Sequence, residues 1–240
     1  MTSFQLLQIK RKPDHDVIEL LEENVIGTPG ESMLYRHKNV RSKVITIPDA
    51  YFANLSIRNR LYGTICLSKR NVYIQGKQHQ VFYLRYFTFR EKFRTINPKD
   101  HKRKTPSKIR EEIAKLMNGE GLDYHEELTL YAYVDPENTR SKRLIEEFGF
   151  IIMGKFHTIP FSRFFPKYYH LVEKLKETDF DQVKKQLLDF YQREQLVSFE
   201  QLFSRGELFV IRKDGEIICG VQAIFDSWEI LDLPGIVESL

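Results

Sequence analysis

The amino-acid sequence predicts a mixed α/β fold: a central mixed sheet flanked by helices, followed by a smaller C-terminal unit. Segments of strand composition come first and then alternate with segments of helical periodicity. Hydrophobic residues make up 42% of the 240 residues, which is enough for a buried core. The charge is uneven. Residues 171–240 carry 8 Lys and Arg against 14 Asp and Glu, a net charge of −6, which leaves +10 on residues 1–170.

Composition and pattern exclude several classes of protein. No run approaches the roughly 18 apolar residues that span a bilayer, and the N-terminus lacks the pattern of a secretory signal. Cys66 and Cys219 fit neither zinc-ligand spacing nor a disulfide framework. The seven histidines are scattered, so no metal site is predicted. We therefore expect a soluble, cytoplasmic protein with no membrane partner.

The first half of the chain reads as a helix followed by strands. Apolar residues of Asp14–Val25 recur at helical spacing. Tyr51–Ile57 and Leu61–Leu67 are two strands joined by the short polar link Arg58-Asn59-Arg60, which predicts a hairpin. Asn71–Ile74 and the aromatic segment Val81–Phe89 are expected to be strands, separated by a polar loop.

Helices and strands then alternate. Ser107–Met117 has one apolar stripe and follows Pro106, a residue suited to a first helical turn. Leu128–Val134 is predicted as a strand, Thr139–Phe148 as a short helix ending at Gly149, and Phe150–Met153 as a further strand.

The last third resembles the beginning of a second copy of the same pattern. A helical segment around Phe180–Tyr191 precedes a hairpin formed by Leu208–Arg212 and Glu216–Phe225. We expect residues 1–170 to form one domain and residues 171–240 to begin a second, incomplete one. The alternative is that two ordinary hairpins look alike.

One succession of segments points to a known family. The strand VFYLRYFTF, a basic loop, the helix SKIREEIAKLM and the strand LTLYAYV are followed by NTRSKRLIEEFGF, Asn138–Phe150. This order resembles the GNAT superfamily of acyl-CoA-dependent N-acetyltransferases, in which an asparagine is followed, two residues on, by Ser or Ala and then by a helix closing in Gly-Phe. The resemblance covers about residues 5–165 and, for the first half of a second unit, about residues 175–240. It implies a GNAT-like sheet in each unit.

The resemblance also implies a site for acetyl-CoA as cosubstrate. In the family, the loop and helix start after the fourth strand hold the cofactor's pyrophosphate with backbone N–H groups. The matching stretch is His101–Ser107, but Lys104 and Pro106 stand where the family has small residues, so positive side chains would have to compensate. The residues expected to bind the cofactor are Phe87, Thr88, Phe89, Arg103, Lys104, Thr105, Ser107, Lys108, Asn138 and Ser141.

No catalytic residue is assigned. Where many family members have a tyrosine that protonates the leaving thiolate, this chain has Ile145. Tyr131 and Tyr133 on the neighbouring strand are interpreted as packing residues, and Glu91 as a solvent-facing carboxylate. The acceptor is expected to be a small-molecule or protein amine, and a homodimer is left open.

Two alternative functions are also considered. A catalytically degenerate GNAT-like module could sense a ligand or bind another protein. Binding of nucleic acid through the basic stretch Lys99–Arg110 is disfavoured, because no recognition-helix signature or aromatic-interleaved basic face accompanies it.

Overall fold

The computed structural model describes residues 4–27, 29–30, 33–90, 107–124, 128–135, 138–155, 169–191, 206–223 and 228–233. The chain forms two compact units. The first comprises Met1–Arg70, Gln80–Phe150 and Ser227–Leu240, and the second Asn71–His79 and Ile151–Asp226. The division of the sequence at residue 170 into a domain and an incomplete copy stays a prediction.

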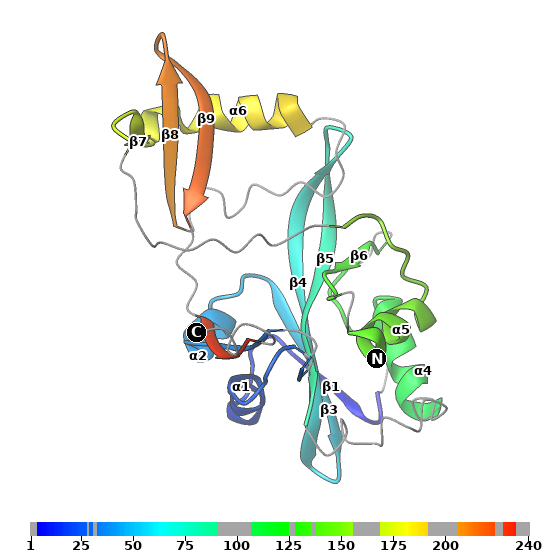
Figure 1. Cartoon of the computed structure of the whole chain (residues 1–240). Helices are drawn as coiled ribbons and strands as arrows, with labels where there is room; N and C mark the ends of the chain where they lie inside the picture. Colours follow the sequence, from blue (N-terminus) through cyan, green and yellow to red (C-terminus); the bar gives the residue numbers. More distant parts are fainter. Residues whose placement is uncertain are drawn as a thin grey trace. The chain divides into compact units, whose positions relative to one another are not determined.

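A five-stranded mixed sheet forms the centre of the first unit (Figure 1). Its order is β1-β3-β4-β5-β6, with β1–β3 and β3–β4 antiparallel and β5–β6 parallel. The strands are β1 (Leu7–Lys10), β3 (Ala50–Ile57), β4 (Arg60–Ile74), β5 (Lys77–Phe89) and β6 (Leu130–Ala132). This sheet, with helices on its faces, confirms the predicted fold class, a mixed α/β fold with a central mixed sheet flanked by helices.

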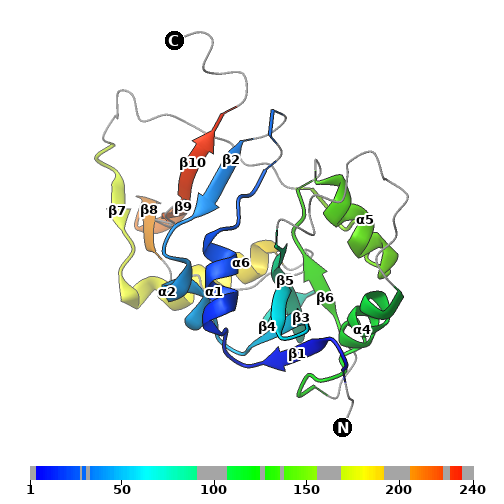
Figure 2. The ribbon, with the colours of Figure 1, turned by 90° about the horizontal axis from the view of Figure 1, so that it is seen from below.

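Each face of the sheet is covered by different helices, which lie on opposite sides of the strands in Figure 2. We call the two sides the α1 face, covered by α1 (His15–Glu22) and α2 (Val40–Ile45), and the α4 face, covered by α4 (Ser107–Met117) and the end of α5 (Thr139–Glu147). The buried residues of the α1 face are Val17, Ile18, Leu20, Leu21, Val40, Val44, Ala50, Phe52, Leu61 and Cys66. Those of the α4 face are Leu7, Tyr51, Ala53, Leu55, Ile65, Leu67, Phe82, Leu84, Ile109, Ile113, Leu116 and Leu122. Successive residues of β3 alternate between the two sets, as the two-residue period of a strand requires.

Tight turns close the hairpins at the positions that the sequence indicates. Arg58 and Asn59 have φ of 50° and 60°, and Asp214 and Gly215 have φ of 53° and 83°. Two consecutive residues with positive φ give the backbone twist that suits two-residue hairpin turns. The polar segment after Ile74 is shorter than expected, because β5 already begins at Lys77.

The second unit contains a three-stranded antiparallel sheet of order β7-β8-β9. Its elements are β7 (Val172–Lys174), the 3-10 helix η1 (Glu177–Asp179), α6 (Phe180–Tyr191), β8 (Glu207–Lys213) and β9 (Glu216–Ala223). Leu175, Val183 and Val210 form its buried cluster. Among the described residues, this core is much smaller than that of the first unit.

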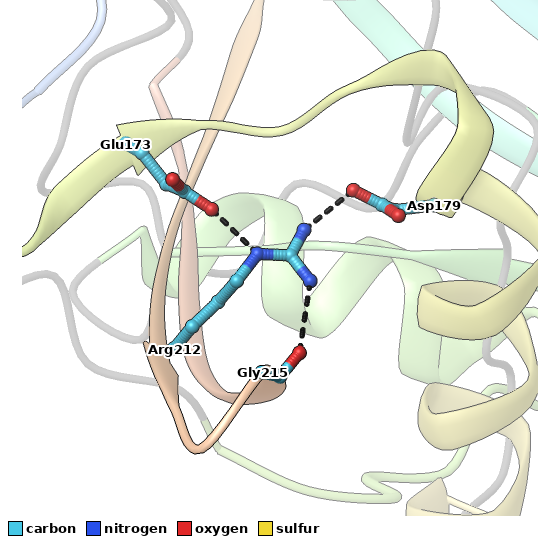
Figure 3. Close-up of polar contacts among 4 residues, drawn as sticks. All are labelled: Glu173, Asp179, Arg212 and Gly215. Carbon is cyan, nitrogen blue, oxygen red and sulfur yellow. Dashed lines mark hydrogen bonds and ion pairs between the residues drawn. The ribbon is translucent and has the colours of Figure 1, made fainter.

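Arg212 ties the elements of this small unit together (Figure 3). Its guanidinium donates from Nε to Glu173 on β7, from Nη2 to Asp179 on η1, and from Nη1 to the carbonyl oxygen of Gly215 at 3.3 Å. The hydrogen bond with Glu173 raises the pKa of Arg212. One side chain thus joins two strands, the turn between β8 and β9, and the segment before α6.

The structure corrects two expectations about strands. Phe150–Met153 is not a strand, and Ile151, Ile152 and Met153 are 77%, 64% and 63% exposed. An apolar run forms a strand only beside a partner, and among the described residues none pairs with this segment. β6 is shorter than the predicted segment Leu128–Val134, because only Leu130–Ala132 pairs with β5.

Four of the described strands lie outside the sequence prediction: β1, β2, β7 and β10. β2 (Leu34–His37) pairs in antiparallel fashion with β10 (Trp228–Asp232), in a separate two-stranded sheet of the first unit. The Tyr35 and Trp228 rings stack with centroids 5.0 Å apart, and Arg36 forms an ion pair with Glu229. The C-terminal strand thus returns to the unit that contains the N-terminus.

Candidate functional site

The ladder between the parallel strands β5 and β6 is short. Phe82, Tyr83 and Leu84 pair with Leu130, Tyr131 and Ala132. The Phe82 N–H also donates to the Thr129 carbonyl oxygen at 2.9 Å. β6 ends at Ala132 whereas β5 continues to Phe89, so β6 does not accompany β5 beyond Leu84. Among the described residues, β6 thus pairs with β5 only in the middle of that strand, at Phe82–Leu84.

Directly after this point β5 contains an irregularity. Tyr86 has a φ of 53°, a left-handed conformation that costs about 1–3 kcal/mol in a residue other than glycine. Phe82 and Leu84 belong to the α4 face, and so do Phe87 and Phe89, whereas Tyr86 packs on the α1 face. The side-chain alternation shifts by one residue at Tyr86, which is the effect of a β-bulge.

This bulge is a feature that the sequence analysis missed. Because β5 is aromatic on both faces, the change of period is hidden in a segment that reads as a uniformly buried strand. Bulges re-aim side chains and are common beside active sites. The end of the β5–β6 ladder and the bulge therefore mark the same position as the candidate site.

The three candidate residues on β5 use their side chains for packing. The rings of Phe87 and Phe89 lie on the α4 face with centroids 5.1 Å apart. Thr88 is buried on the other side, and its hydroxyl donates to Asn24 Oδ1 at 2.9 Å. Any contact of this segment with a cofactor would accordingly involve its backbone.

The candidate residues on α4 lie at its beginning. Ser107 and Lys108 are exposed in the first turn. Arg103, Lys104 and Thr105, with the rest of the basic loop and Glu91, lie outside the described residues. An 11-residue helix has the positive end of its dipole at this turn, which favours an anion there.

A buried carboxylate fixes α4 against the edge of the sheet. Glu112 accepts hydrogen bonds from the backbone N–H groups of Gln5, Leu6 and Leu7, the last two at 2.7 and 2.8 Å. Glu112 is only 3% exposed, and these three donors offset the cost of burying its charge. The helix start is thereby held in a fixed orientation to the strands.

Asn138 and Ser141 lie close together, in a capping arrangement. The Asn138 side chain is the N-cap of α5, and its Oδ1 accepts the Ser141 N–H at 3.0 Å. Asparagine is among the preferred N-cap residues because it satisfies one of the N–H groups left open at a helix start. The spacing of these two residues therefore has a structural explanation in the helix itself. Ile145 lies half-buried in the same helix.

A cavity of about 640 Å³ opens at the far end of β5. Leu20 and Asn24 line it from α1 and the segment after it, Asn59 from the β3–β4 turn, and Phe89 and Arg90 from the end of β5. Its volume lies in the range of small-molecule sites, about 300–1,000 Å³. Phe89 is the residue that this cavity shares with the strand segment named above.

Tyr131 and Tyr133 take part in an aromatic cluster. Tyr131 stacks on Tyr83 with centroids 4.9 Å apart, and Tyr133 meets both rings edge-on. Burial raises the pKa of Tyr131 to about 12 and also raises that of Tyr83. At neutral pH both phenols are protonated and can donate hydrogen bonds, but neither can act as a base.

Comparison with solved structures finds a likeness of fold to the N-myristoyltransferase of Saccharomyces cerevisiae. A structure with bound myristoyl-CoA and inhibitors matches with a TM-score of 0.53 and 14% identity, over 98% of this chain and 62% of that one. Another with bound myristoyl-CoA matches with a TM-score of 0.52 and 14% identity, over 97% and 60%. The chain spans about three fifths of the length of these proteins.

An aminoglycoside acetyltransferase from an uncultured soil metagenomic sample, in complex with trehalose, matches with a TM-score of only 0.39 and 10% identity, over 65% of this chain and 96% of that one. That score is too low to support an argument. No protein-family model and no curated protein matches the sequence. Among the described residues, no helix is both long enough and apolar enough to cross a membrane.

Proposed function

We propose that this chain is an acyl-CoA-dependent N-acyltransferase that transfers an acetyl group from acetyl-CoA to a small-molecule or protein amine. The observation that carries the proposal is the end of the β5–β6 ladder at Leu84–Ala132, directly before the bulge at Tyr86, in a GNAT-like sheet. The likeness of fold to a protein with bound myristoyl-CoA supports acyl-CoA as the donor class.

The cofactor would lie along the part of β5 that β6 does not accompany. The backbone around Phe87, Thr88 and Phe89 would hold the pantetheine arm. The start of α4, with Ser107, Lys108 and the preceding Arg103, Lys104 and Thr105, would bind the phosphates through charge and the helix dipole. Asn138 and Ser141 would act indirectly, by capping the helix that follows β6.

In the proposed reaction, the amine nitrogen attacks the thioester carbonyl carbon. A C–N bond forms and the C–S bond breaks, the amine loses a proton, and the departing thiolate of CoA gains one. A backbone N–H near the bulge would stabilise the oxyanion of the tetrahedral intermediate. Alignment of the two reactants supplies much of the acceleration, so the route tolerates Ile145 in place of a proton donor.

Calorimetric titration of the full chain with acetyl-CoA and with myristoyl-CoA tests the donor. We expect saturable binding of one molecule per chain. Replacing both Arg103 and Lys104 by alanine should weaken the affinity at least tenfold, whereas replacing the exposed Lys38 and Arg41 near and on α2, an equal change of charge, should not. The proposal is refuted if neither acetyl-CoA nor myristoyl-CoA binds. Tighter binding of myristoyl-CoA than of acetyl-CoA would show that the transferred group is not acetyl.

The degenerate module remains a second candidate because Ile145 occupies the place of the family's tyrosine. Mass spectrometry of an amine library incubated with acetyl-CoA and the protein separates the two. An acetylated amine establishes the transferase. Binding of acetyl-CoA without product from any amine would instead favour a ligand-sensing or protein-binding module.

We also propose that residues 171–223 begin a second unit of the same design. The hairpins β3–β4 and β8–β9 each have a two-residue turn and then a register shift at the third residue of the returning strand. A helix precedes each hairpin, α1 in one case and α6 in the other. Equal turn and equal shift support duplication.

A further inference from the structure

Two arginines and three tyrosines gather on the α1 face of the sheet, beside the end of the β5–β6 ladder. Arg70 comes from β4, Tyr83 and Arg85 from β5, and Tyr131 and Tyr133 from β6 and the residue after its end. The guanidinium carbons of Arg70 and Arg85 lie 4.9 and 5.6 Å from the centroid of the Tyr83 ring. We call these five residues the Tyr–Arg cluster.

In the part of the chain that the structure describes, no carboxylate forms an ion pair with Arg70 or Arg85. The neighbouring Tyr131 phenol and Cys66 thiol stay protonated, because burial raises the pKa of each to about 12. Phenols and thiol are thus neutral at physiological pH and do not compensate the arginines.

Arg85 is the more constrained of the two. Its Nη2 donates to the Tyr86 hydroxyl at 2.9 Å and its guanidinium lies 4.4 Å from the Tyr86 ring centroid. Its Nε is buried and has no hydrogen-bond partner among the described residues. A half-buried charge is normally paired, since removing it from water is costly. The stacked rings hold both guanidinium groups in place, which prepares them for a planar or tetrahedral oxyanion.

We propose that the Tyr–Arg cluster binds an oxyanion, carboxylate or phosphate, on the acceptor amine; this inference rests on the proposed transferase function. The cluster lies beside Leu84 and Ala132, where the acyl group would arrive, and on the face opposite α4, whose first turn is assigned to the donor's phosphates. Donor and acceptor would then approach the bulge from different faces. Fork-shaped guanidinium groups bind such anions through two parallel hydrogen bonds.

Binding of the acceptor can be measured without turnover. β-Alanine and phosphoethanolamine are titrated into the full chain at low ionic strength, with propylamine and ethanolamine as matched amines that lack the oxyanion. We expect one or both anionic amines to bind at least tenfold more tightly than their matches. Tighter binding of β-alanine than of propylamine identifies carboxylate as the recognised group, and tighter binding of phosphoethanolamine than of ethanolamine identifies phosphate.

Variants then test the cluster itself. Arg85→Ala and Arg70→Ala should each abolish the preference for the anionic amine, Arg85→Lys should keep part of it, and Arg41→Ala on α2 should keep all of it. Thermal melting checks that the variants fold. If R85A does not fold, the preference for the anionic amine is measured in R85K instead. Equal affinity for amines with and without the oxyanion in the wild-type protein, or an unchanged preference in R85A and R70A, would overturn the inference.

The same titrations separate this inference from the proposed function. If acyl-CoA does not bind while the anionic amines still bind through Arg70 and Arg85, the transferase function fails and the anion site stands as a binding site only. If acyl-CoA binds and the anionic amines do not, the transferase stands and the acceptor assignment is wrong.

Discussion

The hairpins β3–β4 and β8–β9 have the same local design and different surroundings. In each, two residues with positive φ form the turn, and the third residue of the returning strand is the extra one, Tyr62 in β4 and Ile218 in β9. β3 and β4 are covered by helices on both faces, whereas in β9 Ile218 and Val221 are 60% and 62% exposed. Turn chemistry fixes a hairpin's register, but coverage decides what each residue in it contributes to stability.

The glycine of each returning strand makes the contrast concrete. A Cβ on Gly63 would lie 2.4 Å from the Phe89 ring and 2.9 Å from the Thr88 carbonyl oxygen. A Cβ on Gly220 would meet its nearest neighbours, Phe209 and Val210, at 3.4 Å. The first glycine is required because the end of β5 packs against it, and the second has room for a methyl group.

The largest effect is expected for Gly63→Ala. It should lower the free energy of unfolding by about 3 kcal/mol, because neither the backbone nor the packed ring can move away freely. The matched substitution Gly220→Ala should change it by less than about 1 kcal/mol. Urea denaturation of both variants measures the difference. Equal losses would contradict the claim that coverage by β5 distinguishes the two hairpins.

Loss of the buried carboxylate should have the next largest effect. Glu112→Gln replaces one accepting oxygen by an NH₂ group that faces backbone N–H donors, so about 2 kcal/mol of stability should be lost. Glu111→Gln, at the exposed neighbouring position on α4, is the control and should have little effect. Chemical denaturation tests both, and equal stabilities of E112Q and the wild-type protein would show that β1 is held by other contacts.

Arg212 gives the corresponding test in the second unit. Its ion pairs with Glu173 and Asp179 are accessible to solvent, so Arg212→Ala should lower the melting temperature by less than Glu112→Gln does. The loss should shrink further as salt is added, because mobile ions screen exposed charges. A loss that is independent of salt would mean that Arg212 acts by packing.

Each hairpin contains one cysteine, so thiol labelling of the unsubstituted protein compares the two hairpins directly. Cys66 in β4 is buried and Cys219 in β9 is exposed, so a thiol reagent should label Cys219 at once and Cys66 only on unfolding.

Burial raises the pKa of Cys66 from 9.0 to about 12. Its contribution to stability is therefore complete below pH 9 and is lost as the pH rises toward 12, because the unfolded chain gives up this proton first. Cys66→Ala should flatten the fall in unfolding free energy between pH 9 and 10, and an unchanged slope would contradict the assignment.

The sequence predicted features that depend on neighbouring residues. Helical stripes and polar turn residues indicated α1, α4, α6 and both hairpins, because turn chemistry and periodicity act over a few positions. The pairing of β2 with β10 joins segments almost 200 residues apart, and nothing local indicates it. Phe150–Met153 was predicted as a strand from composition alone, which cannot supply a partner strand.

The candidate site likewise contains residues that the sequence could predict and features that it could not. Asn138 and Ser141 were selected by a motif, and their spacing is that of a helix cap. The bulge at Tyr86 was missed, because a positive φ in an aromatic strand arises from packing on two faces and has no signature in the residue types. Similarly, Tyr131 was interpreted as packing, and its proximity to Arg70 on β4 depends on the adjacency of β4, β5 and β6.

Hydrogen exchange of the backbone amides, with and without saturating acetyl-CoA, tests the central claim most directly. We predict that the segment of residues 87–89 in β5 becomes protected, while the hairpin β8–β9 exchanges as before. No added protection in that segment, with acetyl-CoA bound elsewhere or not bound at all, would contradict the assignment of β5 as the acyl-CoA site.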